Sequence, residues 1–209
     1  MMVFYDVDTQ IDFMEESGKL PVPGANKIRP NLKKLTDYAL GEGILILGSS
    51  DRHFEDDEEL ETFPPHFMDG TLGQERIPET KTSEFVIENK YATGEFRTYL
   101  DHHLDEVIDP PAFPRITIEK QKTDVFSNPY TEKLFEKLEV ERAIVYGVAT
   151  DYCIKDAVLG MIDRNVEVYL VEDAISGIDE KLTKESLEKM YNSGVKQIKT
   201  EEVLGGDYS

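Results

Sequence analysis

Short runs of apolar and β-branched residues alternate along this chain with longer segments of helical period, and this alternation limits the possible folds. Strands separated by helices of about a dozen residues imply right-handed βαβ crossovers and a parallel sheet. The runs ILIL and AIVYGVA are apolar throughout, as in strands covered on both faces. We therefore predict an α/β fold with three layers (α/β/α), a mainly parallel sheet of about six strands, and one domain over residues 1–209.

The same two periods predict the individual elements. We expect strands at Val3–Asp8, Ile44–Ser50, Phe85–Glu88, Arg115–Glu119, Ala143–Ala149, Val166–Glu172 and Val195–Lys199. We expect helices at Asn26–Leu40, Asn128–Leu138, Asp151–Arg164 and Glu180–Asn192. Residues 80–114 give the weakest indication of secondary structure.

The charge balance limits the partners. Asp and Glu number 43 against 23 Lys and Arg, a formal net charge of −20. Such a surface repels phosphate backbones and anionic headgroups, so we expect a small-molecule partner and neither nucleic acid nor membrane. With no secretory-type leader and no apolar run of membrane-spanning length, we expect a cytoplasmic protein. We also expect a homo-oligomer.

Four polar residues lie at or just beyond the carboxyl ends of predicted strands: Asp8, Asp51, Lys120 and Cys153. In an open parallel sheet, ligands bind at the carboxyl ends of the strands, so these residues form a candidate site. Cys153 is the only cysteine, which excludes an internal disulfide. A lone cysteine is either a small buried hydrophobe or a reactive thiol.

Cys153 lies where a strand ends and a helix begins, and Thr150 or Asp151 can cap that helix. The free N–H groups of a first helical turn favour a thiolate and can hold an oxyanion. An Asp could take the thiol proton, with Lys120 stabilising the charges that result. A carboxylate is a weak base, so burial would have to raise its pKa.

A second set of residues is suited to a metal ion. Asp51 and His53 are two apart in an extended segment and point the same way, and His66 follows a loop stiffened by two prolines. Two imidazoles and a carboxylate leave coordination positions open and favour zinc, with iron or manganese possible, over calcium or magnesium. Glu59 or Glu61 could add a ligand.

Several segments together resemble one known family. VDTQIDF (residues 7–13) followed by LPVPGA, then FPPHFMDGT, IEK and GVATDYCIKDAVLGM, look like the isochorismatase-like cysteine hydrolases, and within them the nicotinamidases. The resemblance covers nearly the whole chain. It implies Asp8 as acid/base, Lys120 as the third triad member and Cys153 as nucleophile. It also implies a cis peptide between Val148 and Ala149, with the N–H groups of Ala149 and Cys153 as oxyanion hole.

The resemblance also bears on the metal set and on some alternatives. Nicotinamidases use an Asp-x-His…His set of this kind, which isochorismatases lack. Asp6 and Asp12 compete with Asp8, and Lys122 competes with Lys120; the motif spacing favours Asp8 and Lys120. An apolar residue usually occupies the place of Asp6, which shares a strand face with Asp8 by period two and could raise its pKa.

Aromatic residues lie beside the motifs. Phe13, Phe63 and Phe126 could form a wall for a pyridine ring, or they could be ordinary core residues. The segment VFSNP departs from the family's usual Phe-x-Gly-Thr, which affects the expected shape of that loop. His102 and His103 are expected at a solvent-facing helix end, without a role.

These observations predict an amidohydrolase that converts nicotinamide to nicotinate and ammonia through a cysteine thioester, with a metal positioning the substrate. The alternatives are a cysteine hydrolase of the same fold acting on another small amide, such as a carbamoyl or ureido compound, and a non-catalytic binding protein.

Overall fold

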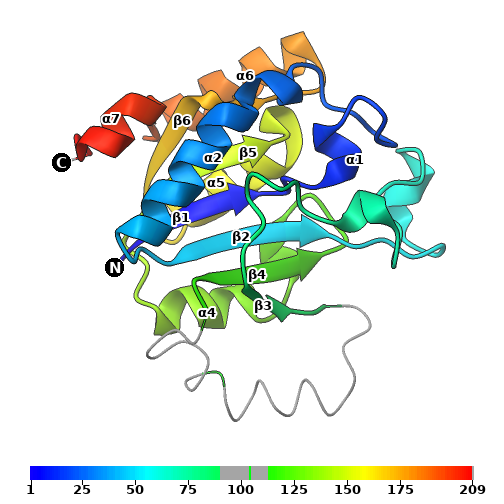
Figure 1. The fold of residues 1–209 in the computed structure, drawn as a ribbon, viewed down its shortest axis with the longest axis horizontal. Helices are drawn as coiled ribbons and strands as arrows, with labels where there is room; N and C mark the ends of the chain where they lie inside the picture. Colours follow the sequence, from blue (N-terminus) through cyan, green and yellow to red (C-terminus); the bar gives the residue numbers. More distant parts are fainter. Residues whose placement is uncertain (90–103, 105–112, 209) are drawn as a thin grey trace.

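The computed structural model describes residues 1–89, 104 and 113–208, so His102 and His103 lie outside the described residues. A seven-stranded, all-parallel sheet crosses this described part (Figure 1), in the order β3-β4-β2-β1-β5-β6-β7. The predicted α/β fold is confirmed, with seven strands instead of about six because all seven expected segments join the sheet. The strands are β1 (Met2–Val7), β2 (Ile46–Asp51), β3 (Glu84–Ile87), β4 (Arg115–Lys120), β5 (Arg142–Val148), β6 (Glu167–Ser176) and β7 (Lys196–Ile198).

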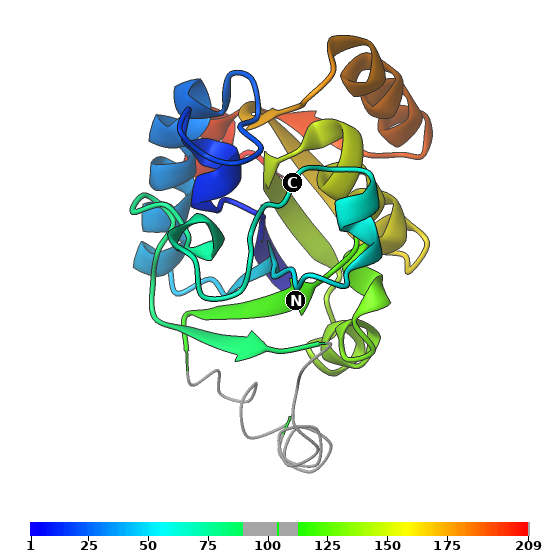
Figure 2. The same ribbon diagram turned by 90° about the vertical axis from the view of Figure 1, so that its right-hand side faces the viewer.

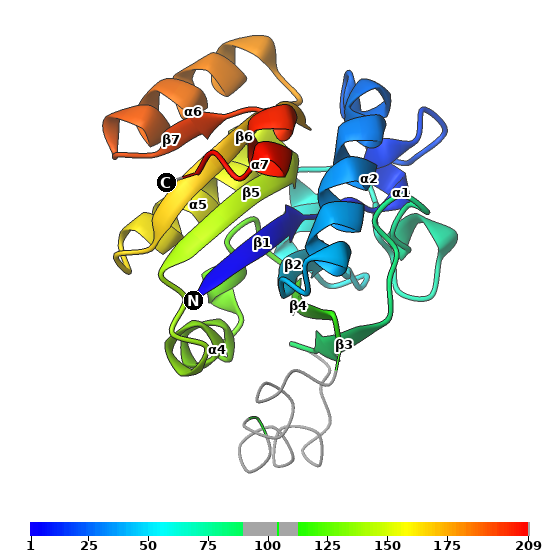
Figure 3. The same ribbon diagram turned by 60° about the vertical axis from the view of Figure 1, so that its left-hand side comes forward.

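Helices cover both faces of the sheet (Figures 1 and 3). One face carries α1 (Ile11–Met14), α2 (Ala25–Gly41) and α7 (Thr200–Gly205). The other carries α4 (Thr131–Lys137), α5 (Lys155–Ile162) and α6 (Glu180–Asn192). Of the helices described, none combines the length and the apolar character that crossing a bilayer requires.

The two faces explain the sequence patterns. In α2, the residues Ile28, Leu32, Leu35 and Ala39 share one buried stripe against the sheet. Each fully buried Leu contributes about 1.5–3 kcal/mol to such packing. From Ala143 to Val148, strand β5 carries buried, largely apolar residues because successive side chains enter opposite cores.

All seven strands are parallel, so their carboxyl ends meet at one edge of the sheet, and Figure 2 looks onto this edge. A short 3₁₀ turn, η1 (Glu58–Glu61), lies in the segment between β2 and β3. The expected helix Asp151–Arg164 is divided: a π-helical turn, η4 (Thr150–Ile154), precedes α5. Turns of this kind are rare and frequently mark functional sites.

Candidate active site

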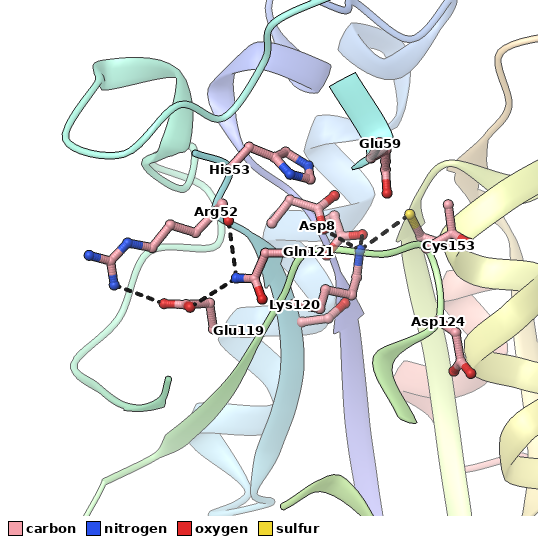
Figure 4. Close-up of polar contacts among 12 residues, drawn as sticks. Asp8, Arg52, His53, Glu59, Glu119, Lys120, Gln121, Asp124 and Cys153 are labelled. Carbon is pink, nitrogen blue, oxygen red and sulfur yellow. Dashed lines mark hydrogen bonds and ion pairs between the residues drawn. The ribbon is translucent and has the colours of Figure 1, made fainter. Parts of the chain in front are cut away.

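The four polar residues predicted at the strand ends lie together. Figure 4 labels three of them, Asp8, Lys120 and Cys153. Lys120 Nζ lies 2.9 Å from Asp8 Oδ2, 2.6 Å from Asp51 Oδ1 and 3.4 Å from Cys153 Sγ. A carboxylate oxygen of Asp8 and the sulfur are within 4.8 Å of each other. Lys120 is 1% exposed and Cys153 2%. We call Asp8, Asp51, Lys120 and Cys153 the catalytic cluster; a thiol and two carboxylates meet in it around the Lys120 ammonium group.

Asp8 directly follows β1 and has a left-handed backbone, with φ 46°. This conformation interrupts the strand alternation, so the expectation that Asp6 and Asp8 share a face is wrong. The Asp6 carboxylate instead contacts Arg115 at 2.8 Å and Arg76 at 3.1 Å, on the other side of the sheet. Burial raises the pKa of Asp8. The positive charge of Lys120 opposes this rise, and the negative charge of Asp51 adds to it.

The competing lysine is far less suited to the role. Lys122 is exposed and lies 3.6 Å from Glu58. Burial alone would lower the pKa of Lys120, but Asp51 and Asp8 raise it well above its ordinary value. Lys120 is therefore a fixed positive charge inside the catalytic cluster.

Cys153 differs from the expectation that its helical turn favours a thiolate. Burial raises the pKa of the Cys153 thiol well above its ordinary value, and Asp8 adds to the rise while Lys120 opposes it. The resting side chain is therefore a thiol, and nucleophilic attack requires transfer of its proton to a base.

The turn that carries Cys153 has an unusual backbone. The Val148–Ala149 peptide bond is cis, as the resemblance predicted. The Ala149 carbonyl accepts hydrogen bonds from the N–H groups of Tyr152 and Ile154, both at 3.1 Å. Neither Thr150 nor Asp151, the expected capping residues, caps this turn with its side chain.

Beside the catalytic cluster lies the candidate metal site. Asp51, His53, Glu59 and His66 each offer a ligand atom, and these atoms lie within 4.8 Å of one another. Buried Asp51 Oδ2, His53 Nε2 and His66 Nε2 have no hydrogen-bond partner among the described residues. Buried polar atoms are normally paired, so these atoms fit a divalent ion as their common partner.

The second nitrogen of each histidine ring is already engaged. His53 Nδ1 lies 3.2 Å from Asp57 Oδ2, and His66 Nδ1 lies 2.8 Å from the Pro64 carbonyl oxygen. Such contacts orient a ring so that the free nitrogen faces a metal. Burial lowers the pKa of both His53 and His66, which favours the neutral, ligating form. The sequence analysis did not identify Asp57 as a partner of His53, although Asp57 lies only four residues after His53 in the sequence.

Glu59 and Glu61 were both open as an extra ligand, and the structure brings Glu59 to the site. Glu59 Oε1 lies 3.9 Å from His66 Nε2, and its side chain points toward Cys153 (Figure 4). Burial, followed by the negative charge of Asp51, raises the pKa of Glu59 to about 7. Glu61 is exposed and does not belong to this group.

The remaining polar residues of the first motif position the site. The Gln10 side chain donates to the Asp51 carbonyl and accepts from the Asp51 N–H, both at 2.8 Å. Asp12 accepts from the N–H of Phe67 at 2.8 Å and so holds the segment that carries His66. Sequence spacing alone identified Asp12 only as a competitor of Asp8.

The three predicted aromatic residues do not form one wall. The rings of Phe13 and Phe63 lie beside His66, with centroid separations of 5.9 and 6.1 Å. Phe126 packs on Phe135 at 5.3 Å and lies under the Arg164 guanidinium. Phe13 and Phe63 are therefore the aromatic residues next to the candidate metal site.

The departing segment VFSNP forms a 3₁₀ turn, η3 (Val125–Ser127). Asp124 accepts from the N–H of Phe126, and Asn128 Nδ2 donates to the carbonyls of Ile87 and Glu119. These hydrogen bonds tie the loop to the ends of β3 and β4.

Comparison with known proteins gives a consistent result. Residues 100–202 match the isochorismatase domain model. The chain is 23% identical over 184 residues to the nicotinamidase of Escherichia coli (strain K12), covering 83% of this chain and 82% of that protein. It is 22% identical over 200 residues to a "Probable inactive nicotinamidase" from Arabidopsis thaliana, covering 91% of this chain and 88% of that protein.

Among solved structures, the pyrazinamidase of Pyrococcus horikoshii in complex with zinc is similar over 95% of this chain and 98% of its own. The TM-score is 0.73 and the sequence identity 24%. This likeness shows that the two chains share a fold.

Proposed function

We propose that this chain is an isochorismatase-like hydrolase and that it converts a small amide, nicotinamide, to nicotinate and ammonia through a thioester on Cys153. The observation that carries the proposal is the convergence of Asp8, Lys120 and Cys153 beside four side chains that could hold a metal ion. The similarity to proteins named nicotinamidase and to a zinc-bound pyrazinamidase supports the substrate class.

In the first step, Asp8 takes the proton of the Cys153 thiol and the sulfur attacks the amide carbon. The raised pKa of Asp8 makes it a stronger base than an exposed carboxylate. Lys120 lies 3.4 Å from the sulfur and stabilises the negative charge that forms there. The cluster supplies base and counter-charge together.

The tetrahedral intermediate places a negative charge on the former carbonyl oxygen. We assign its stabilisation to the backbone N–H groups of Ala149 and Cys153. Asp8 returns the proton to the amide nitrogen, the C–N bond breaks and ammonia leaves. Water then gives a proton to Asp8 and attacks the thioester; the acid departs and Cys153 recovers the proton.

Asp51, His53 and His66 would hold the divalent ion, with Glu59 as a further ligand. We expect zinc, with iron or manganese as the other suitable ions. When bound, the ion supplies a Lewis acid that orients the ring nitrogen of the substrate. Phe13 and Phe63 would flank that ring, since both lie beside His66.

Two alternatives stay open to the same test: hydrolysis of a carbamoyl or ureido compound, and binding without catalysis. A cytoplasmic homo-oligomer is part of the same proposal.

The test is ammonia release from nicotinamide, pyrazinamide, a carbamoyl amino acid and a ureido acid, using protein made without an affinity tag. We expect the two ring amides to have the highest kcat/KM. A preference for a carbamoyl or ureido compound would replace the proposed substrate, and release from none of the four would favour the binding protein.

A further inference from the structure

Asp151 lies two residues before Cys153, and the mechanism above does not use it. Its side chain is 2% exposed. Its carboxylate accepts from the Ile178 N–H, at 3.0 Å to Oδ1 and 3.2 Å to Oδ2, and from the Asp179 N–H at 2.9 Å. Within the described part of the chain, no lysine, arginine or histidine forms an ion pair with this carboxylate.

These bonds join two segments far apart in sequence. Ile178 and Asp179 lie between β6 and α6, whereas Asp151 is in η4, the turn that carries the nucleophile. The loop approaches closely at Gly177, where an added Cβ would stand 3.1 Å from Asp151 Oδ1. Lys155 Nζ donates to the Asp151 carbonyl at 2.9 Å, so the backbone of Asp151 is held as well as its side chain.

The anchored turn has no side-chain cap of its own. Its backbone depends on the Ala149 carbonyl, which accepts two N–H groups, and on the attachment at Asp151. Cys153 Sγ must stay near Lys120 and Asp8, and a displacement of about 1 Å can cost about 10²-fold in rate.

We propose that Asp151 is the positioning residue of the nucleophile turn: by binding the loop that precedes α6, it fixes Cys153 against Asp8 and Lys120. The kinetic measurement in the test of this inference rests on the proposed function. The second measurement, the rate at which the single cysteine is alkylated, does not depend on that function. Removing the carboxylate leaves the N–H groups of Ile178 and Asp179 without this acceptor and lets the turn move.

The test compares Asp151→Ala with a matched variant of the same loop, Asp179→Ala. Asp179 Oδ1 accepts from the Leu182 N–H at 2.8 Å and caps α6, so its loss weakens the loop but leaves the backbone N–H that Asp151 binds. For each variant, kcat, KM, Tm and the rate of Cys153 alkylation by iodoacetamide are measured.

For Asp151→Ala we expect kcat to fall about 10- to 100-fold and KM to change less than about threefold. Alkylation should become about fivefold faster, since a released turn exposes the thiol. Asp179→Ala should lower Tm while kcat and alkylation stay within about twofold of wild type. Asp151→Asn keeps one acceptor oxygen, so its effects should be intermediate, and it carries the test if the alanine variant does not fold.

The proposal is overturned if Asp151→Ala leaves kcat and alkylation unchanged, or if Asp179→Ala produces the same changes at the same loss of Tm. Wild-type protein that hydrolyses no amide would remove the proposed function alone, because the alkylation rates would still decide whether Asp151 positions Cys153.

Discussion

Two groups of buried charge lie on opposite sides of strands β1 and β4, and they differ in charge balance. The first, which we call the arginine cluster, consists of Asp6, Arg76, Glu84 and Arg115. Asp6 contacts both guanidinium groups, and Arg76 also lies 3.5 Å from Glu84. Arg115 donates to the Thr80 carbonyl at 3.0 Å. Two positive charges face two negative ones.

In the catalytic cluster the charges do not balance. Lys120 is the cation that pairs with Asp8 and Asp51 within the described residues, and Glu59 adds a further acid nearby. Asp8 Oδ2 meets Lys120 as an ion pair at 2.9 Å, and Asp51 Oδ2 lacks a hydrogen-bond partner among the described residues. A balanced cluster of this kind holds strands together, whereas an unbalanced one is poised to take up a proton or a cation.

The nucleophile gives the largest expected difference between the clusters. Cys153→Ala should lower kcat at least about 10⁴-fold, because a methyl group cannot form the thioester, and Asp8→Asn should be nearly as severe. Ammonia release and circular dichroism measure activity and folding. Substantial activity in folded Cys153→Ala would contradict covalent catalysis.

Breaking the arginine cluster should lower the free energy of unfolding and leave kcat/KM of the folded protein nearly unchanged. Arg115→Met leaves part of the Asp6 charge uncompensated, and we expect a loss of about 3–5 kcal/mol in the free energy of unfolding. Arg29→Met, which removes partly exposed ion pairs with Glu15 and Glu79, should cost about 1 kcal/mol or less. Urea unfolding measures both, and a large fall in kcat/KM of folded Arg115→Met would show that the clusters are coupled.

Metal removal should lower activity through the site beside the catalytic cluster and leave the arginine cluster unchanged. We expect chelation to lower activity on nicotinamide about 10²-fold, with recovery on adding zinc, iron or manganese. His53→Ala and His66→Ala should mimic the chelated protein, and Asp57→Asn should weaken metal affinity about 10- to 100-fold. Elemental analysis gives the metal content. Full activity in metal-free protein would remove the metal from the proposal.

The pH dependence should report the environment of Asp8. In the proposed mechanism the Asp8 carboxylate is the base, so activity is lost as pH falls through its pKa. Burial raises that pKa, so the acid limb of kcat/KM should lie above about 4, the ordinary value for Asp. The profile is measured with folding monitored at each pH. An acid limb at or below that value would mean that the buried setting does not strengthen the base.

The smallest effects should separate two of the predicted aromatic residues. Phe63→Leu should raise KM about three- to tenfold, because Phe63 lies beside His66. Phe126→Leu should leave KM within about twofold and cost about 1 kcal/mol of stability, since its ring packs on Phe135. A larger KM change in Phe126→Leu would indicate that the Phe126 ring contacts the substrate after all.

The sequence alone determined the layered α/β fold and the edge at which the site lies. Both follow from local patterns: continuous apolar runs define strands covered on two faces, and parallel strands carry their polar ends to the same edge. Asp8, Lys120 and Cys153 were found because each lies at or just beyond the end of a strand-like run. Asp51, His53 and His66 were found from residue type and spacing.

Only the tertiary structure decided which neighbours each of these residues meets. Period two placed Asp6 with Asp8, but the left-handed backbone at Asp8 separates them, and a backbone angle at one residue is not readable from a hydrophobic pattern. The choice of Glu59 over Glu61 depended on how η1 packs over the site. The attachment of Asp151 to the loop before α6 spans 27 residues, so it exists only once β5 and β6 have paired and brought that loop beside the nucleophile.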